Sequence, residues 1–338
     1  MRRVFFAFLI VAGVAAAAAR VSAQGYVQHN VVSSIPGLAD QTDDRLINAW
    51  GIYVKRNGTV VVNATDADLS LAYKRDGAAL PLAVEVPGGP TGIAYNSTSD
   101  FVISANGKSG RSQFLFVTEA GTILGWNPNV DATHAVVAVN AFGGAIYKGI
   151  ALATTDSGES YLYAADFHNS RVNIYDGDFK FVKSFTDPAL ANNSFGPFNV
   201  ANIGGYIYVA FAMQNADKDE EIAGAGFGYV DVFDKQGNFL RRFASEGALN
   251  APWAIVRAPS SFGEFAGAIL VGNFGDGWIN AFNNSTGAPL GHLTTSGGQA
   301  VAIDGLWGLT FHNGTLWFAA GPNLEEDGLV GTLKPATP

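Results

Sequence analysis

A short apolar segment recurs six times along the chain, and each copy is followed by sequence typical of β-strands. Measured between the third residues of successive copies, the spacings are 41, 57, 50, 55 and 54 residues. Spacings of this size, with variable loops, are typical of β-propeller blades. The six copies are Ala49–Ile52, Pro90–Ile93, Tyr147–Ile150, Pro197–Val200, Pro252–Ile255 and Leu306–Leu309.

The strand pattern within one repeat is clearest after the third copy. Residues 146–153 form a small-residue apolar strand, 161–165 a second strand with the apolar run of a fully buried strand, 171–175 an alternating third strand, and 179–185 an outer strand. The same order returns in the later repeats. We therefore predict an all-β fold, a six-bladed β-propeller of four-stranded blades.

The last repeat lacks an outer strand of its own. Little sequence follows residues 329–333, whereas Tyr26–Ile35 precede the first inner strand and have no blade of their own. We expect this N-terminal segment to close the last blade, because a closed ring has no open sheet edge that could pair with another chain.

The first 23 residues have the pattern of a secretory signal. Arg2 and Arg3 precede an apolar stretch over residues 4–19, and small residues end at Ala23. We expect a mature protein that begins at Gln24, with one propeller domain over residues 24–338. The expected product is a secreted monomer, or a periplasmic one in a Gram-negative host, without a membrane span once the signal is removed.

Composition excludes several classes of function. The chain has no cysteine, which rules out thiol catalysis, iron–sulfur clusters and zinc sites built on cysteine. Without the signal, 17 basic residues face 29 acidic ones, so nucleic acid is an unfavourable partner. Seven Asn-x-Ser/Thr sequons would permit glycosylation in a eukaryotic host, although such residues are also common in β-turns. They are Asn57, Asn63, Asn96, Asn192, Asn283, Asn284 and Asn313.

Several segments resemble known propeller families. The strand and turn Val230–Gly237 look like an NHL-type repeat, and residues 31 to about 331 resemble a family of exported six-bladed propellers of unknown function, found mainly in bacteria. Segments that carry this resemblance include Ala164–His168, Val271–Gly277 and Ile303–Leu309. The family implies no catalytic residues. This chain departs from its pattern at Ala49 and Ala254, and no sorting anchor follows Pro335, which favours a freely secreted form.

Propeller topology predicts where the functional side chains gather. In each blade, the start of the inner strand and the loop between the second and third strands lie at the same face of the ring. The starts of the inner strands supply six candidate ligand-binding residues: Trp50, Thr91, Lys148, Asn199, Trp253 and Trp307. The loops supply Asp66, Lys108, Asp166, His168, residues 215–221, Asp276 and residues 325–327.

Two functions from different classes fit these residues. The first is a binding or scaffold protein whose axial mouth holds a carbohydrate, a peptide or another small polar ligand against the tryptophans. The second is a metal-assisted hydrolase or lyase, in which Asp66, Asp166 and Asp276 hold Ca²⁺ or another divalent cation while His168 or Lys148 moves a proton. Residues 215–221 read either as a solvated acidic flap or as a Ca²⁺ loop, since they lack the glycine of an EF-hand. We expect binding, because no nucleophile motif is present.

Overall fold

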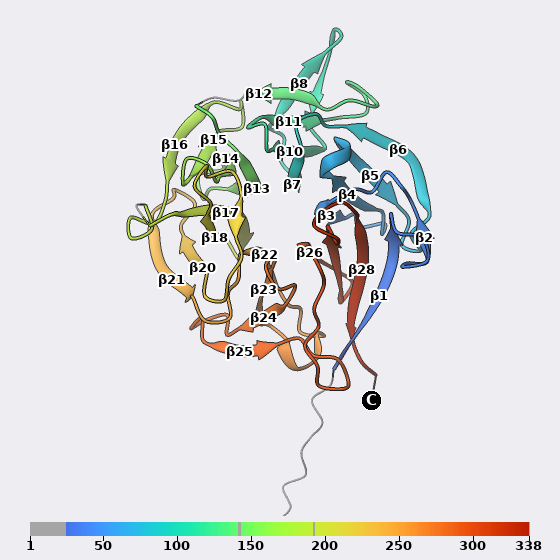
Figure 1. The fold of residues 1–338 in the computed structure, drawn as a ribbon. Coiled ribbons are helices and arrows are strands. Elements are labelled where there is room, and N and C mark those ends of the chain that lie inside the picture. Colours follow the sequence, from blue (N-terminus) through green and yellow to red (C-terminus); the bar gives the residue numbers. More distant parts are fainter. Residues whose placement is uncertain (1–24, 141–142, 192, 338) are drawn as a thin grey trace, which may run out of the picture.

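The computed structural model describes residues 25–140, 143–191 and 193–337, and the fold is a ring of six antiparallel sheets (Figure 1). The predicted signal at residues 1–23 lies outside the described residues. From axis to rim, blade one consists of β3 (Ala49–Val54), β4 (Val60–Ala64), β5 (Leu69–Tyr73) and β6 (Ala79–Glu85). Blade two consists of β7 (Pro90–Tyr95), β10 (Phe114–Thr118), β11 (Ile123–Trp126) and β12 (Val136–Val139). Blade three consists of β13 (Tyr147–Thr154), β14 (Ser160–Asp166), β15 (Arg171–Tyr175) and β16 (Phe181–Phe185).

Blades four and five have the same order, and blade six confirms the predicted closure. Blade four consists of β17 (Phe195–Ile203), β18 (Tyr206–Gln214), β20 (Gly228–Phe233) and β21 (Phe239–Ser245), with the short β19 (Glu221–Ile222) beside β18. Blade five consists of β22 (Pro252–Arg257), β23 (Ile269–Asn273), β24 (Ile279–Phe282) and β25 (Pro289–His292). Blade six consists of β26 (Leu306–His312), β27 (Thr315–Ala320), β28 (Leu329–Pro335), β1 (Tyr26–Ser33) and β2 (Gln41–Thr42). β1 pairs antiparallel with β28, so the first strand of the chain completes its last blade.

The six recurring segments are the places where the inner strands approach one another around the axis. In every blade, the pairing of the innermost two strands is irregular at this segment. The glycines there permit close backbone contact: a Cβ on Gly51 would lie 2.4 Å from the Thr91 carbonyl oxygen, and one on Gly308 would lie 2.4 Å from the Trp50 carbonyl oxygen. The repeat was detectable in the sequence because each copy lies where the inner strands of neighbouring blades pack closely around the axis.

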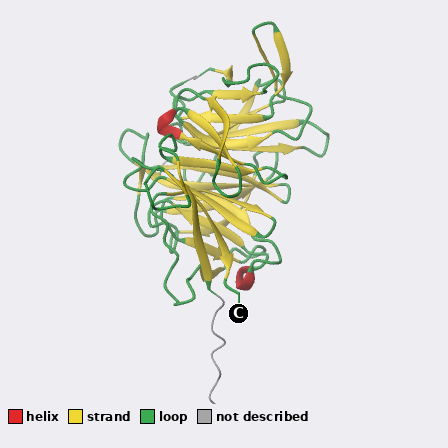
Figure 2. Ribbon diagram, turned by 90° about the vertical axis from the view of Figure 1, so that its right-hand side faces the viewer, coloured by secondary structure: helices red, strands yellow, loops and turns green. Residues whose placement is uncertain are grey.

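Blade two differs from the prediction. A hairpin of β8 (Val102–Ala105) and β9 (Lys108–Arg111) is inserted between its first and second sheet strands, and it projects from the ring (Figures 1 and 2). Lys108 therefore lies in this hairpin and not in the loop between the second and third strands of the blade. That loop instead contains Glu119, because β10 ends at Thr118.

The only helical elements in the described ranges are two single 3₁₀ turns, η1 (Thr65–Ala67) and η2 (Gly263–Phe265). No helix in this part of the chain is long and apolar enough to span a membrane.

Two of the sequon asparagines, Asn63 and Asn96, are fully buried, and their amides donate to backbone carbonyl oxygens. A glycan has no space at either position of the folded protein, so these two glycosylation predictions are wrong. Asn192 lies outside the described residues.

Candidate functional site

The strand register places the starts of the inner strands and the second-to-third loops on one face of the ring, as predicted. Tyr147 at the start of β13 pairs with Asp166 at the end of β14, and Ala49 pairs with Ala64 just before η1. We call this face the axial mouth. It is the end of the ring at which all six inner strands begin.

The three predicted tryptophans meet at the axis, but they pack against one another. Trp307 is stacked between Trp50 and Phe274, with ring centroids 3.7 and 4.1 Å away, and Trp253 meets it edge-on at 6.0 Å. With Phe198, which lies 5.6 Å from Trp307, these rings form what we call the aromatic plug. The tryptophan side chains are at most 5% exposed. A ligand could stack on them only after the plug had opened.

The two uncharged polar candidates, Thr91 and Asn199, connect neighbouring blades beside the plug. The Thr91 hydroxyl donates to the carbonyl oxygens of Val117 and Tyr147, and the Asn199 amide donates to the Trp253 carbonyl oxygen at 2.9 Å. Trp253 in turn donates its indole N–H to the Lys148 carbonyl oxygen at 2.9 Å. These contacts hold the inner strands together, and their role in ligand binding stays a prediction.

Lys148 lies at the centre of the axial mouth and is only 1% exposed. Its ammonium nitrogen is 2.5 Å from Glu119 Oε1, 3.5 Å from Glu220 Oε2 and 5.2 Å from the centre of the Trp50 ring. Burial disfavours the charged form, but the surrounding carboxylates outweigh burial and raise the Lys148 pKa well above its ordinary value. Lys148 is therefore a permanent positive charge near neutral pH.

The carboxyl groups around this ammonium outnumber it. Burial raises the pKa of Glu221 to about 7, although the Lys148 charge acts in the opposite direction, and one of its oxygens is buried without a hydrogen-bond partner in the described structure. Burial likewise raises the pKa of Glu325 to about 7, against the lowering effect of a hydrogen bond from Asn48. Burial also raises the pKa of Asp66. The axial charge cluster, as we use the term, comprises Lys148, Asp66, Glu119, Glu220, Glu221 and Glu325.

A chain of hydrogen bonds connects the plug to the cluster. The Trp307 indole donates to Asn48 Oδ1 at 3.0 Å, and the Asn48 amide donates to Glu325 Oε1 at 3.0 Å. The backbone of Asn48 is in the left-handed region, with φ of 47°. One side chain therefore bonds both the aromatic plug and the axial charge cluster.

Asp166 and Asp276, which we predicted as metal ligands, are occupied within their own blades. Asp166 is fully buried and accepts hydrogen bonds from Asn169, Asn173 and Arg171. Asp276 accepts from two asparagine amides and from the backbone N–H of Trp278. Of the three predicted ligands, only Asp66 belongs to the axial charge cluster. Over the described ranges, no three histidine or acidic side chains are grouped so that they could hold a metal ion.

His168 and the acidic loop complete the list of predicted positions. His168 follows β14, and its Nδ1 is buried without a hydrogen-bond partner among the described residues; a part in proton transfer stays a prediction. The acidic loop is closed by the side chain of Asn215, whose amide donates to Asp219 Oδ1 and whose Oδ1 accepts from the Asp219 backbone N–H. Glu220 and Glu221 then reach the axis. The loop therefore contributes carboxylates beside Lys148, and its interpretation as a Ca²⁺ loop stays a prediction.

The sequence missed Glu119, the closest partner of Lys148. The available signal was the apolar run Phe114–Thr118 followed directly by the turn Glu119–Gly121, which has the form of a second strand and its loop. The β8–β9 hairpin obscured it, because an inserted pair of strands has the same local pattern as a pair within the blade.

An axial channel opens toward the other face of the ring. Its volume is about 310 Å³, and the inner strands line it with side chains that include Ile150, Val200 and Leu309. Trp253 and Asn199, at the starts of their strands, line it too. The aromatic plug therefore lies between this channel and the axial charge cluster.

These features define a six-bladed β-propeller whose axis is closed by aromatic rings beneath a carboxylate-rich cluster around a buried lysine. Two uncharacterized proteins of Acanthamoeba polyphaga mimivirus are 36% and 34% identical to this chain over 90% of its length, which corresponds to 78% and 84% of their own lengths. The chain belongs to the same family as these proteins. The relatives found are thus viral, whereas the resemblance led us to expect mainly bacterial ones. No family model matches the sequence.

Solved structures with the same fold are much more distant in sequence. A streptogramin B lyase matches 93% of this chain and 99% of its own at a TM-score of 0.57 and 14% identity. Virginiamycin B lyase from Staphylococcus aureus matches 91% of this chain and 98% of its own at a TM-score of 0.54 and 13% identity, and a luciferin-regenerating enzyme matches 92% and 95% at 0.54 and 13%. At such identities the likeness establishes the propeller fold alone.

Proposed function

We propose that the axial mouth binds a small ligand that carries positive charge, either a divalent cation such as Ca²⁺ or a molecule with an ammonium group. The observation that carries this proposal is the imbalance of charge, since five carboxyl groups interact electrostatically with one buried ammonium, and two of them, Glu221 and Glu325, are largely removed from water. Confining ionised carboxylates away from water is costly unless cations pair with them. A bound cation would offset that cost.

The Lys148 ammonium shows how an organic cation would be held. It already lies between carboxylate oxygens and over the face of Trp50, a combination that recognises ammonium groups in proteins. Glu221 and Glu325 have no comparable cation of their own. Since no metal-ligand group is preformed in the described ranges, an ammonium ligand fits the present side-chain positions better than a divalent ion does.

Affinity should rise with pH. The pKa values of Glu221 and Glu325 lie near 7, so both are mostly protonated at pH 6 and mostly ionised at pH 8. A cation binds the ionised forms and competes with protons for them. We therefore expect tighter binding at pH 8 than at pH 6, with release of protons on binding.

Calorimetric titration of the purified protein with Ca²⁺ and, separately, with choline tests the proposal. We expect at least one probe to bind, and Glu325→Gln to weaken its affinity tenfold or more, about 1.4 kcal/mol. Glu264→Gln, an exposed change in η2, is the matched control and should bind like the unaltered protein. The proposal fails if neither probe binds at millimolar concentration, or if both variants bind equally well.

A lyase-like enzyme is the second candidate. Glu221 and Glu325 have pKa values close to those of effective general acids and bases at neutral pH, and Lys148 is a fixed positive charge that would stabilise a developing anion. Proton transfer would then be the task of the glutamates, since Lys148 stays protonated. The propeller fold shared with streptogramin B lyase is compatible with this reading. Turnover in a panel of lactones and cyclic esters that is lost in Glu221→Gln would favour catalysis over binding alone.

A further inference from the structure

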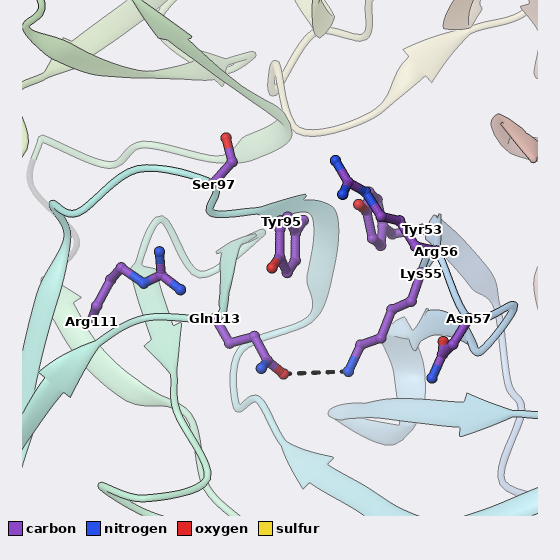
Figure 3. A pocket seen from close by; sticks show the side chains of 8 residues that line it. All are labelled: Tyr53, Lys55, Arg56, Asn57, Tyr95, Ser97, Arg111 and Gln113. Atoms are coloured by element: carbon purple, nitrogen blue, oxygen red, sulfur yellow. Dashed lines mark hydrogen bonds between the residues drawn. The ribbon is translucent and has the colours of Figure 1, made fainter.

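A pocket of about 680 Å³ lies between blades one and two, away from the axial mouth. Tyr53 and Tyr95 come from the far ends of the inner strands β3 and β7, so the pocket is on the opposite face of the ring. Arg111, from the inserted β8–β9 hairpin, lies on the other side of Tyr95 from Lys55 and Arg56 (Figure 3). None of these groups belongs to the axial charge cluster.

The charge of this pocket is opposite to that of the whole protein. Lys55, Arg56 and Arg111 line it, no acidic residue does, and the chain as a whole has a net charge of −9. Within the described ranges, no ion pair involves any of these three cations. An accumulation of unpaired cations on an acidic protein indicates a site for an anion.

The contacts of the cations are with neutral groups. The Lys55 ammonium donates to Gln113 Oε1 at 3.3 Å and lies 5.1 Å from the centre of the Phe114 ring, and Arg111 donates to the Thr98 carbonyl oxygen at 2.7 Å. Lys55 is half-buried, and burial lowers its pKa. Because this ammonium is partly removed from water without a carboxylate partner, an anionic ligand would stabilise it.

Two tyrosine rings give the pocket a flat wall. Tyr53 and Tyr95 are parallel within 9°, with centroids 5.4 Å apart, and both rest edge-on against Phe114. Tyr95 is still 38% exposed. A rigid, accessible aromatic ring can contact the apolar face of a sugar, while Gln113, Asn57 and Ser97 offer hydrogen bonds to hydroxyl groups.

We propose that this pocket binds an acidic saccharide, that is, a sugar ring bearing carboxylate or sulfate groups. The cations hold the acid groups and the tyrosines contact the ring. The site is independent of the proposed cation site, and the β8–β9 hairpin supplies one of its three cations, Arg111.

Calorimetric titration with trigalacturonate, a sulfated heparin disaccharide, neutral cellobiose and AMP tests the proposal. We expect one or both acidic sugars to bind more tightly than cellobiose and AMP, and the affinity to fall with added salt. Lys55→Gln and the surface change Arg111→Gln should each weaken binding tenfold or more, and Tyr95→Ala should weaken it as well. Lys183→Gln, an exposed lysine of blade three, and Glu325→Gln at the axial mouth should leave it unchanged.

Three outcomes would overturn the proposal. Equal binding of cellobiose and the acidic sugars would remove the role of charge. Binding of AMP alone would identify the pocket as a phosphate or nucleotide site. Unchanged affinity in Arg111→Gln would place the ligand elsewhere.

Discussion

Replacing Lys148 by methionine should destabilise the protein, and the loss should depend strongly on pH. The substitution keeps the length of the side chain but removes the only cation within the axial charge cluster. Glu119 and Glu220 then lose their ion pairs at 2.5 and 3.5 Å. Both carboxylates stay in contact with water, with 33% of the Glu119 side chain and 60% of the Glu220 side chain exposed, so the loss of these two pairs contributes about 1 kcal/mol.

The pH dependence follows from Glu221 and Glu325. Their pKa values are raised to about 7, and the Lys148 charge holds both lower than burial alone would, so the substitution raises them further. Each added pKa unit corresponds to about 1.4 kcal/mol, so one unit on each group gives about 3 kcal/mol. An acid whose pKa is raised on folding binds more protons in the folded state, so stability falls as pH rises from the unfolded toward the folded pKa. The added penalty is therefore present at pH 8 and largely absent at pH 5.

Urea denaturation followed by tryptophan fluorescence measures this effect at both pH values. We expect Lys148→Met to lose about 3–4 kcal/mol at pH 8, the sum of both contributions, and about 1 kcal/mol at pH 5, where only the lost pairs contribute. Lys180→Met is the matched control, since it breaks an exposed pair with Asp178 and should change stability little at either pH. Equal losses at pH 5 and pH 8 for Lys148→Met would refute the electrostatic account and indicate a packing defect.

Two further predictions concern the ring and its export. Deleting residues 25–33 removes β1 and exposes the edge of β28, so thermal unfolding should begin many degrees lower and soluble yield should fall; an unchanged midpoint would contradict closure by the N-terminal strand. Mass spectrometry of the secreted protein should find an N-terminus at or near Gln24, and recovery of a membrane-bound form that retains Met1 would contradict the signal assignment.

The number and order of the blades could be predicted from the sequence because they depend on local patterns. Each copy of the recurring segment lies beside a neighbouring inner strand. In four of the six copies the third residue is a glycine whose Cβ would lie within 3 Å of that strand, whereas Asn199 and Ala254 occupy this place in the other two. The closure by β1 was also predictable, since the N-terminal strand had no blade of its own and the last blade lacked an outer strand. The shared face followed from the alternation of strand direction, which the pairing of Tyr147 with Asp166 confirms.

The contents of the axial mouth were harder to predict. Glu119 was missed, and Lys108 was assigned to the wrong loop, because hydrogen-bond partners, and not local patterns, distinguish β8 and β9 from strands of the blade. Asp166 and Asp276 were correctly placed at the mouth but satisfied by near neighbours in their own blades, a distinction that depends on side-chain positions. Asn63 and Asn96 match glycosylation sequons, but both side chains are buried and leave no space for a glycan in the folded protein.

The sequence alone determined the architecture of this protein, because the same pattern of short strands recurs in each blade and can be recognised within a short stretch of the chain. Tertiary structure alone decided the chemistry at the axis. Glu119, Glu220 and Glu325 come from three different blades and meet Lys148 only when the ring closes. Their charges and pKa values result from mutual distance and from burial, and neither quantity exists until the fold brings the blades together.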